Sequence, residues 1–153
     1  MKKYLRFFIV LPFIFMLAGC LSNYSVAKAQ SQGTTLQGMR KEIKFGDWIK
    51  TSVLSVEHQS AELFWNDEGA VPVIPNQPHR VRVFVRLNAG FFKGEWHGHG
   101  IVNATLQKGH QYFINGKWRK NNDKVTAYIW IQDKNGQRAS PVVSVPCHWT
   151  ALV

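Results

Sequence analysis

Hydrophobic and polar residues alternate with a period of two along much of the chain. In residues 79–87 every second position is aliphatic, and the positions between them hold Arg80, Arg82, Phe84 and Arg86. Residues 124–131 repeat the pattern, with Thr126, Tyr128 and Trp130 between the aliphatic positions. A period of two is typical of β-strands that bury one face and leave the other outside. We therefore expect these arginines and aromatic rings on outer sheet faces.

Strand-like runs separated by turn residues fill the rest of the chain. The runs are expected at 47–56, 61–65, 100–106, 111–118 and 141–149, with a short extra strand at 42–45. Clusters of Asn, Asp, Gly and Pro separate them at 66–69, 75–78, 121–123 and 133–136. Alternatively, Asn115-Gly116 closes a two-residue hairpin that splits the 111–118 run. Seven or eight short strands, with no window of helical period, predict one all-β antiparallel sandwich.

One local segment suggests the type of sandwich. Leu106, Gly109 and Tyr112 form a pattern that resembles the turn before the penultimate strand of immunoglobulin-like and fibronectin type III-like domains. In those domains the tyrosine hydroxyl bonds back to the upstream backbone, forming a tyrosine corner. The resemblance covers about residues 100–136 and implies an immunoglobulin-like sandwich, with a transthyretin-like one as the alternative because strand order is not readable. It implies no particular function, since such folds carry unrelated activities.

The first twenty residues have the pattern of an export signal. Residues 1–6 carry three cations and no acid, and the apolar run 7–18 is too short to span a bilayer. The run ends in Leu17-Ala18-Gly19-Cys20, which resembles a bacterial lipobox. The resemblance implies a signal peptide at 1–19, a lipidated Cys20 and, by default, the periplasmic face of the outer membrane. The alternative is cleavage after Ala29 in an A-x-A pattern, which would leave the protein without lipid.

The segment after Cys20 differs in composition from the rest of the chain. Residues 21–39 are rich in Ser, Gln, Gly and Ala and lack a sustained period. We therefore expect a lipidated N-terminus and flexible tether at 20–39, followed by the sandwich domain at 40–153.

Charge and cysteine count limit the classes of function. The chain holds 19 Lys and Arg against 9 Asp and Glu, and removing residues 1–19 leaves 16 cations against the same 9 anions. An exported basic surface is expected to meet anionic lipid head groups, anionic glycans or an acidic envelope protein, and not nucleic acid. Two cysteines exclude a disulfide scaffold or a four-cysteine zinc site. Once Cys20 is lipidated, Cys147 is a single thiol, expected to be a buried apolar residue or, alternatively, to form an intermolecular disulfide.

Cations and aromatic rings together suggest a binding surface. The chain has six tryptophans, and it has no nucleophile elbow, zinc-protease motif or phosphate-binding loop. We therefore predict a non-catalytic binding or assembly module without a cofactor. Alternatively, the rings and long basic side chains only shield the outer faces of the sheets. The predicted binding residues are Arg80, Arg82, Arg86, Trp118, Arg119, Tyr128 and Trp130.

A histidine pair supports an alternative function. On a strand, His97 and His99 point to the same face about 7 Å apart. With His110 or His79 as a third ligand, they could hold Cu or Zn in a periplasmic metal-binding protein. Alternatively, the glycines around the pair mark an irregular, bulged strand on which the histidines are merely exposed.

Overall fold

The computed structural model describes residues 33–44, 46–57, 59–60, 69–89 and 94–150. In these ranges the chain is all-β, and no helix long and apolar enough to cross a bilayer is found. The strands are β1 (Thr35–Gln37), β2 (Met39–Lys44), β3 (Asp47–Val56), β4 (Gln59–Ser60), β5 (Val71–Pro72), β6 (Pro78–Ala89), β7 (Glu95–Thr105), β8 (Gln111–Asn121), β9 (Lys124–Asp133) and β10 (Val143–Thr150).

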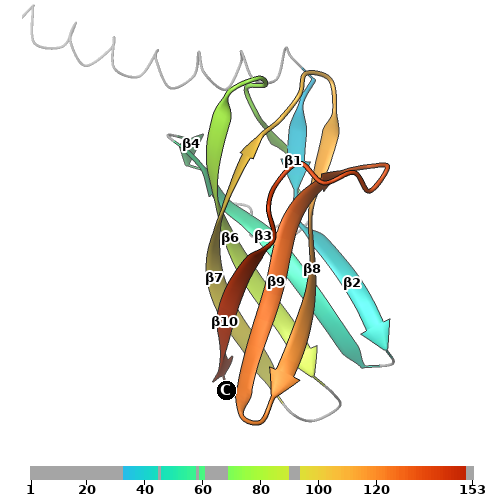
Figure 1. Ribbon diagram of the computed structural model, residues 1–153, viewed down its shortest axis with the longest axis vertical. Coiled ribbons are helices and arrows are strands. Elements are labelled where there is room, and N and C mark those ends of the chain that lie inside the picture. The colour runs from blue at the N-terminus through green and yellow to red at the C-terminus, as the bar shows by residue number, and fades with distance from the viewer. Residues whose placement is uncertain (1–32, 45, 58, 61–68, 90–93, 151–153) are drawn as a thin grey trace, which may run out of the picture.

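The strands form one strongly curled sheet whose two halves face each other (Figure 1). The order is β2-β3-β6-β7-β10-β9-β8-β1-β5, with β4 beside β3. We call β2, β3, β6 and β7 the β6 layer, and β9, β8, β1 and β5 the β9 layer. β10 joins the layers because it pairs with β9 from Val143 to Cys147 and with β7 from His148 to Thr150. The predicted all-β sandwich is confirmed in this curled form.

The strand order, which the sequence left open, follows the chain from β2 through β3 and β6 to β7 and from β8 through β9 to β10, whereas β1 and β5 lie at the edge of the β9 layer beside β8. β2, β3, β6 and β7 pair antiparallel in succession, and so do β8, β9 and β10. The short β1 pairs parallel with β8. The register shifts at Glu42/Lys44 in the β2–β3 pair and at Val53/Ser55 in the β3–β6 pair, and alternate residues between these points share one outer face.

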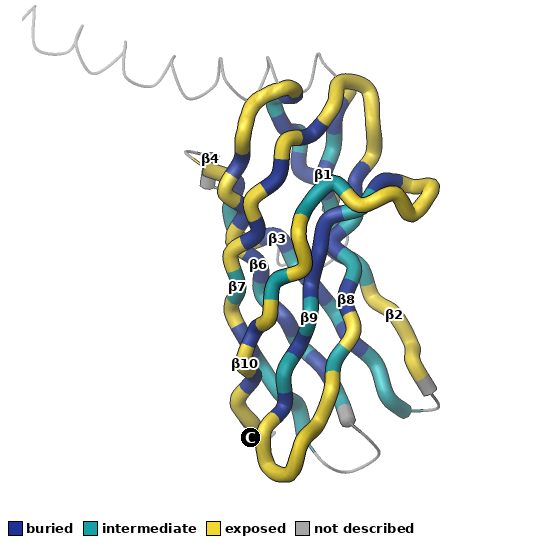
Figure 2. The backbone as a smooth tube through the Cα atoms, in the orientation of Figure 1, coloured by how far each residue is buried: buried dark blue, intermediate teal, exposed yellow. Residues whose placement is uncertain are grey.

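The core lies between the two layers and has the predicted composition (Figure 2). The aliphatic residues of β6, including Val83 and Leu87, are fully buried, as are Ile129 and Ile131 of β9. Burying each such side chain stabilises the fold by roughly 1.5–3 kcal/mol. Because alternate residues of these strands fill the core, the residues between them must lie on the outer faces.

The domain begins earlier than the sequence suggested. β1 and the first residue of β2 fall within the tether expected up to residue 39, and Leu36 is fully buried. The Thr34 hydroxyl donates to the Gln107 carbonyl at 3.1 Å, so even the residue before β1 is fixed to the β7–β8 turn. The boundary near residue 40 was therefore wrong, because Leu36 supplies core contacts that no periodicity revealed. The signal peptide, Cys20 and the tether up to residue 32 lie outside the described residues, as does the strand expected at 61–65.

The chain crosses from the β9 layer to the β6 layer at Gly38. A Cβ at this position would overlap the backbone carbonyl of Thr51, so only glycine allows the crossing. The Thr51 hydroxyl accepts from the Met39 N–H at 3.0 Å and donates to the Ile114 carbonyl at 2.6 Å. One buried hydroxyl thus ties together the strands β2, β3 and β8.

Two local predictions for β8 have different outcomes. The tyrosine corner is present, since the Gln107 N–H donates to the Tyr112 hydroxyl at 3.0 Å. The alternative hairpin at Asn115-Gly116 is wrong, because β8 runs unbroken and turns only at Asn122-Asp123. Gly116 is buried, and a Cβ there would lie 3.0 Å from Ile49 Cδ1 of the opposite layer. Gly116 is therefore needed for close packing between the layers and does not form a turn.

Candidate functional site

The predicted arginines of β6 lie on the outer face of the β6 layer. Arg80 and Arg82 are exposed, and Arg86 is partly exposed. The register aligns Arg86 with Lys50 of β3 and with His97 of β7. These strands thus extend the basic surface sideways from β6.

Extending the register across all five strands gives a continuous line of basic side chains. Arg40 of β2 is opposite Lys50, and His148 of β10 is opposite His97. We call this line the basic row, and its members are Arg40, Lys50, Arg86, His97 and His148. Strands lie about 4.8 Å apart, so the row extends for roughly 19 Å. Such a line of basic side chains forms a surface that attracts anionic groups.

Glu95 neutralises part of the basic row. Its Oε2 accepts hydrogen bonds from Arg86 at 2.7 and 3.1 Å and lies 3.2 Å from His97 Nε2. Burial raises the pKa of Glu95, but hydrogen bonds and charge from Arg86 and His97 outweigh it and hold the pKa below its usual value. Arg86 is therefore partly engaged within the protein, whereas the side chain of Arg82, on the same face of β6, has no hydrogen bond or ion pair to another described residue.

The two histidines of the predicted metal pair do share an outer face. The Phe84 ring packs between them, with centroid distances of 5.5 Å to His97 and 4.9 Å to His99. The expected third ligands lie elsewhere: His110 stacks on Tyr112 beyond the end of β7, and His79 is buried and bonded to the Ile74 carbonyl. In the described part of the chain, no three His, Cys, Asp or Glu side chains come together as a metal site.

The glycines beside these histidines have a packing role. A Cβ on Gly98 would lie 2.8 Å from Val145 Cγ1 and 2.9 Å from Cys147 Sγ, and a Cβ on Gly100 would lie 2.6 Å from Val145 Cγ2. β7 is paired with β6 throughout in regular register, so the expected bulged strand is not found. The glycines are required because β10 packs its side chains directly against β7.

The predicted aromatic residues do not share one surface. Trp118 faces inward and packs against the core, whereas the neighbouring Arg119 faces outward and is exposed. Trp130 points outward but is only 8% exposed, because Arg138 lies over its ring at 5.0 Å. Its Nε1 donates to Gln132 at 2.7 Å. Trp118 and Trp130 are therefore poorly placed for contact with a partner.

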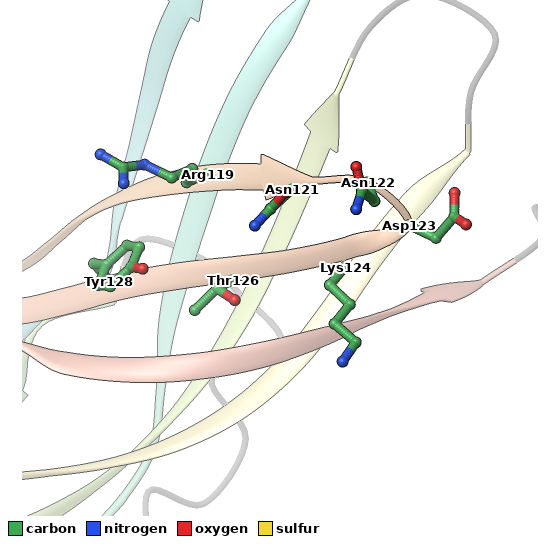
Figure 3. A pocket seen from close by; sticks show the side chains of 7 residues that line it. All are labelled: Arg119, Asn121, Asn122, Asp123, Lys124, Thr126 and Tyr128. Carbon is green, nitrogen blue, oxygen red and sulfur yellow. The ribbon is translucent and has the colours of Figure 1, made fainter.

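Arg119 and Tyr128 instead line a hollow on the outer face of the β8–β9 hairpin (Figure 3). The hollow has a volume of about 520 Å³. Its lining is polar apart from one ring, and consists of Arg119, Asn121, Asn122, Asp123, Lys124, Thr126 and Tyr128. Of the predicted binding residues, Arg119 and Tyr128 thus belong to this hollow, and Trp118 and Trp130 to neither surface. Arg80, Arg82 and Arg86 lie on the outer face of the β6 layer, which together with the basic row we call the basic face.

Sequence reasoning missed several members of both surfaces. Residues 121–123 were interpreted only as a turn, and Lys124 only as the start of a strand. The two-residue turn between alternating strands was the available signal for a shared surface. Arg40, Lys50 and His148 had no such signal, because only the strand order brings them to Arg86 and His97.

Comparison with known proteins yields no match to a protein-family model, a curated protein sequence or a solved structure.

Proposed function

We propose that this protein is a lipid-anchored lipoprotein of the bacterial cell envelope and acts as a non-catalytic binding or assembly module. In this proposal Cys20 carries the lipid at the periplasmic face of the outer membrane. The outer face of the β6 layer then captures an anionic envelope partner. The observation that carries the proposal is the basic row, which aligns five basic side chains from five neighbouring strands.

The surroundings of the row support contact with an extended partner. Arg80 and Arg82 continue the positive charge along β6, and the apolar side chains Leu54 and Ile101 are 37% and 39% exposed beside Arg82. Arg82, Leu54, Ile101 and His99 border a shallow depression of about 300 Å³. An open sheet face with cations and a few exposed apolar groups suits a large anionic surface better than an enclosed small molecule.

The test compares two double variants that lose the same amount of positive charge, one on the basic face and the other in turns away from it. The detergent-extracted protein carrying Arg40→Gln and Arg82→Gln is compared with one carrying Lys108→Gln and Lys134→Gln, two exposed cations in turns. Both variants have the same net charge. We expect the first variant to elute from immobilised heparin, a linear anionic glycan, at clearly lower salt, and both variants to melt within a few degrees of wild type. Equal elution of the two variants would show that net charge alone, not the basic face, controls anion binding.

The alternative proposal is a Cu or Zn site on His97 and His99. Their shared face supports it, whereas the contact of His97 with Glu95 and the packing of both rings on Phe84 favour a structural role. Calorimetric titration of the wild-type protein and of the His97→Ala/His99→Ala variant with Cu(II) and Zn(II) distinguishes a metal site from a structural role. Sub-micromolar binding that disappears in the double variant would support the metal proposal; we expect none.

A further inference from the structure

The hollow on the β8–β9 hairpin is lined by residues of the β9 layer, none of which belongs to the basic row (Figure 3). We propose that it binds an anionic saccharide, with Tyr128 stacking on a sugar ring and with Arg119 and Lys124, which point to different ends of the hollow (Figure 3), each holding an acidic group. This inference does not depend on the basic face, because the two sites share no residue.

The hollow is formed by a single paired hairpin. Arg119 is directly opposite Thr126, and Asn121 is directly opposite Lys124, so their side chains share the outer face. Asn122 at the turn has φ 52°, a left-handed conformation that asparagine tolerates better than most residues. Because cross-strand pairing fixes the backbone beneath the hollow, a ligand needs to order only the lining side chains.

The polar groups of the lining are not used by the fold. Among the described residues, no hydrogen bond or ion pair engages the side chain of any of the seven lining residues. Two other arginines of the domain are engaged: Arg86 bonds Glu95, and Arg138 lies over Trp130. The guanidinium of Arg119 and the ammonium of Lys124 are therefore available to a ligand.

The composition of the lining indicates the class of ligand. Tyr128 is half-buried and supplies the only ring, while the hydroxyl of Thr126 and the side-chain amides of Asn121 and Asn122 can donate or accept hydrogen bonds. Two cations against the single carboxylate of Asp123 favour a negative ligand. An apolar ligand would leave these groups unpaired, at a cost for each. A ring-shaped, hydroxyl-rich anion satisfies all of them, and the volume falls within the usual range of small-ligand sites, about 300–1,000 Å³.

The probe is tetragalacturonate, an acidic tetrasaccharide, compared with maltotetraose, a neutral one of equal length. Titration of the detergent-extracted protein is followed by calorimetry. We expect saturable binding of the acidic probe and at least tenfold weaker binding of the neutral one. Equal affinities would overturn the anionic class, and absence of saturable binding of both would overturn the site.

Four variants locate the binding. Arg119→Gln and Tyr128→Ala are each expected to weaken binding of tetragalacturonate at least tenfold, and Tyr128→Phe, which keeps the ring, is expected to retain most of the affinity. Lys108→Gln/Lys134→Gln is expected to bind as wild type, because neither lysine belongs to the hollow or to the basic face. Wild-type affinity in both Arg119→Gln and Tyr128→Ala would refute the hollow.

Discussion

Arg86 and Glu95 are joined by two hydrogen bonds, from Nε and Nη2 of the arginine, that converge on one carboxylate oxygen. His97 Nε2 lies within 3.2 Å of the same oxygen. A single acid thus offsets the repulsion between two adjacent members of the basic row. Arg86 is therefore expected to contribute to stability as well as to binding, and charge reversal there would place two carboxylates side by side.

Replacing Glu95 by Gln tests this contact. Because its pKa is lowered in the fold, Glu95 stabilises the protein fully above its unfolded pKa of about 4.5, and the contribution is lost as pH falls through the lower folded pKa. We expect Glu95→Gln to reduce the free energy of unfolding at pH 7 by about 1 kcal/mol. The difference from wild type should vanish at acidic pH, measured by urea unfolding.

The exposed Glu57 provides the control, since its side chain has no partner among the described residues. Glu57→Gln should change stability by no more than about 0.5 kcal/mol. A deficit in Glu95→Gln that persists undiminished at low pH would contradict the ionic role of this carboxylate.

The contact between Gly100 and Val145 predicts a compensating pair of substitutions. Gly100→Ala places a Cβ 2.6 Å from Val145 Cγ2, and we expect it to cost about 1–3 kcal/mol of stability. Val145→Ala removes the clashing methyl group, so the double variant should be more stable than the sum of the single effects by about 1 kcal/mol. Thermal and urea unfolding of all four proteins measure this coupling. If the effects of the two substitutions on the free energy of unfolding were strictly additive, a side chain at position 100 of β7 would not contact Val145 of β10.

Cys147 is expected to be unreactive in the native protein. Burial raises the pKa of its thiol, and a hydrogen bond involving the Ala127 backbone only partly offsets this. Because the thiolate is the reactive form, iodoacetamide should alkylate Cys147 much more slowly in the native state than in denaturant. Mass spectrometry of timed samples measures both rates. Equal rates, or a disulfide-linked dimer on a non-reducing gel, would contradict the buried position of the thiol.

The fold prediction was most reliable where it depended on residues close together in the sequence. The alternation of β6 and β9, and the Leu106–Tyr112 turn, depend on neighbours within a few residues, and both were identified correctly. Leu36 and Gly38 were missed because β1 is short, and its role as the crossing between layers depends on Thr51 and the β7–β8 turn.

The candidate sites depended more strongly on tertiary structure. Alternation correctly placed Arg82 and Tyr128 on outer faces, but it could not show that Arg138 returns to cover Trp130. Alternation also could not show that Arg40 and His148 belong to the same row. These residues come from opposite ends of the domain, and only the order of five strands aligns them.

In the proposed function, lipid on Cys20 holds the basic face within reach of a membrane. The intact mass of the protein extracted from the membranes of its native host tests this anchor. We expect a mass equal to residues 20–153 plus a diacylglyceryl group and an acyl chain. A mass equal to residues 30–153 without lipid would contradict it, since the domain would then be a freely diffusing exported protein.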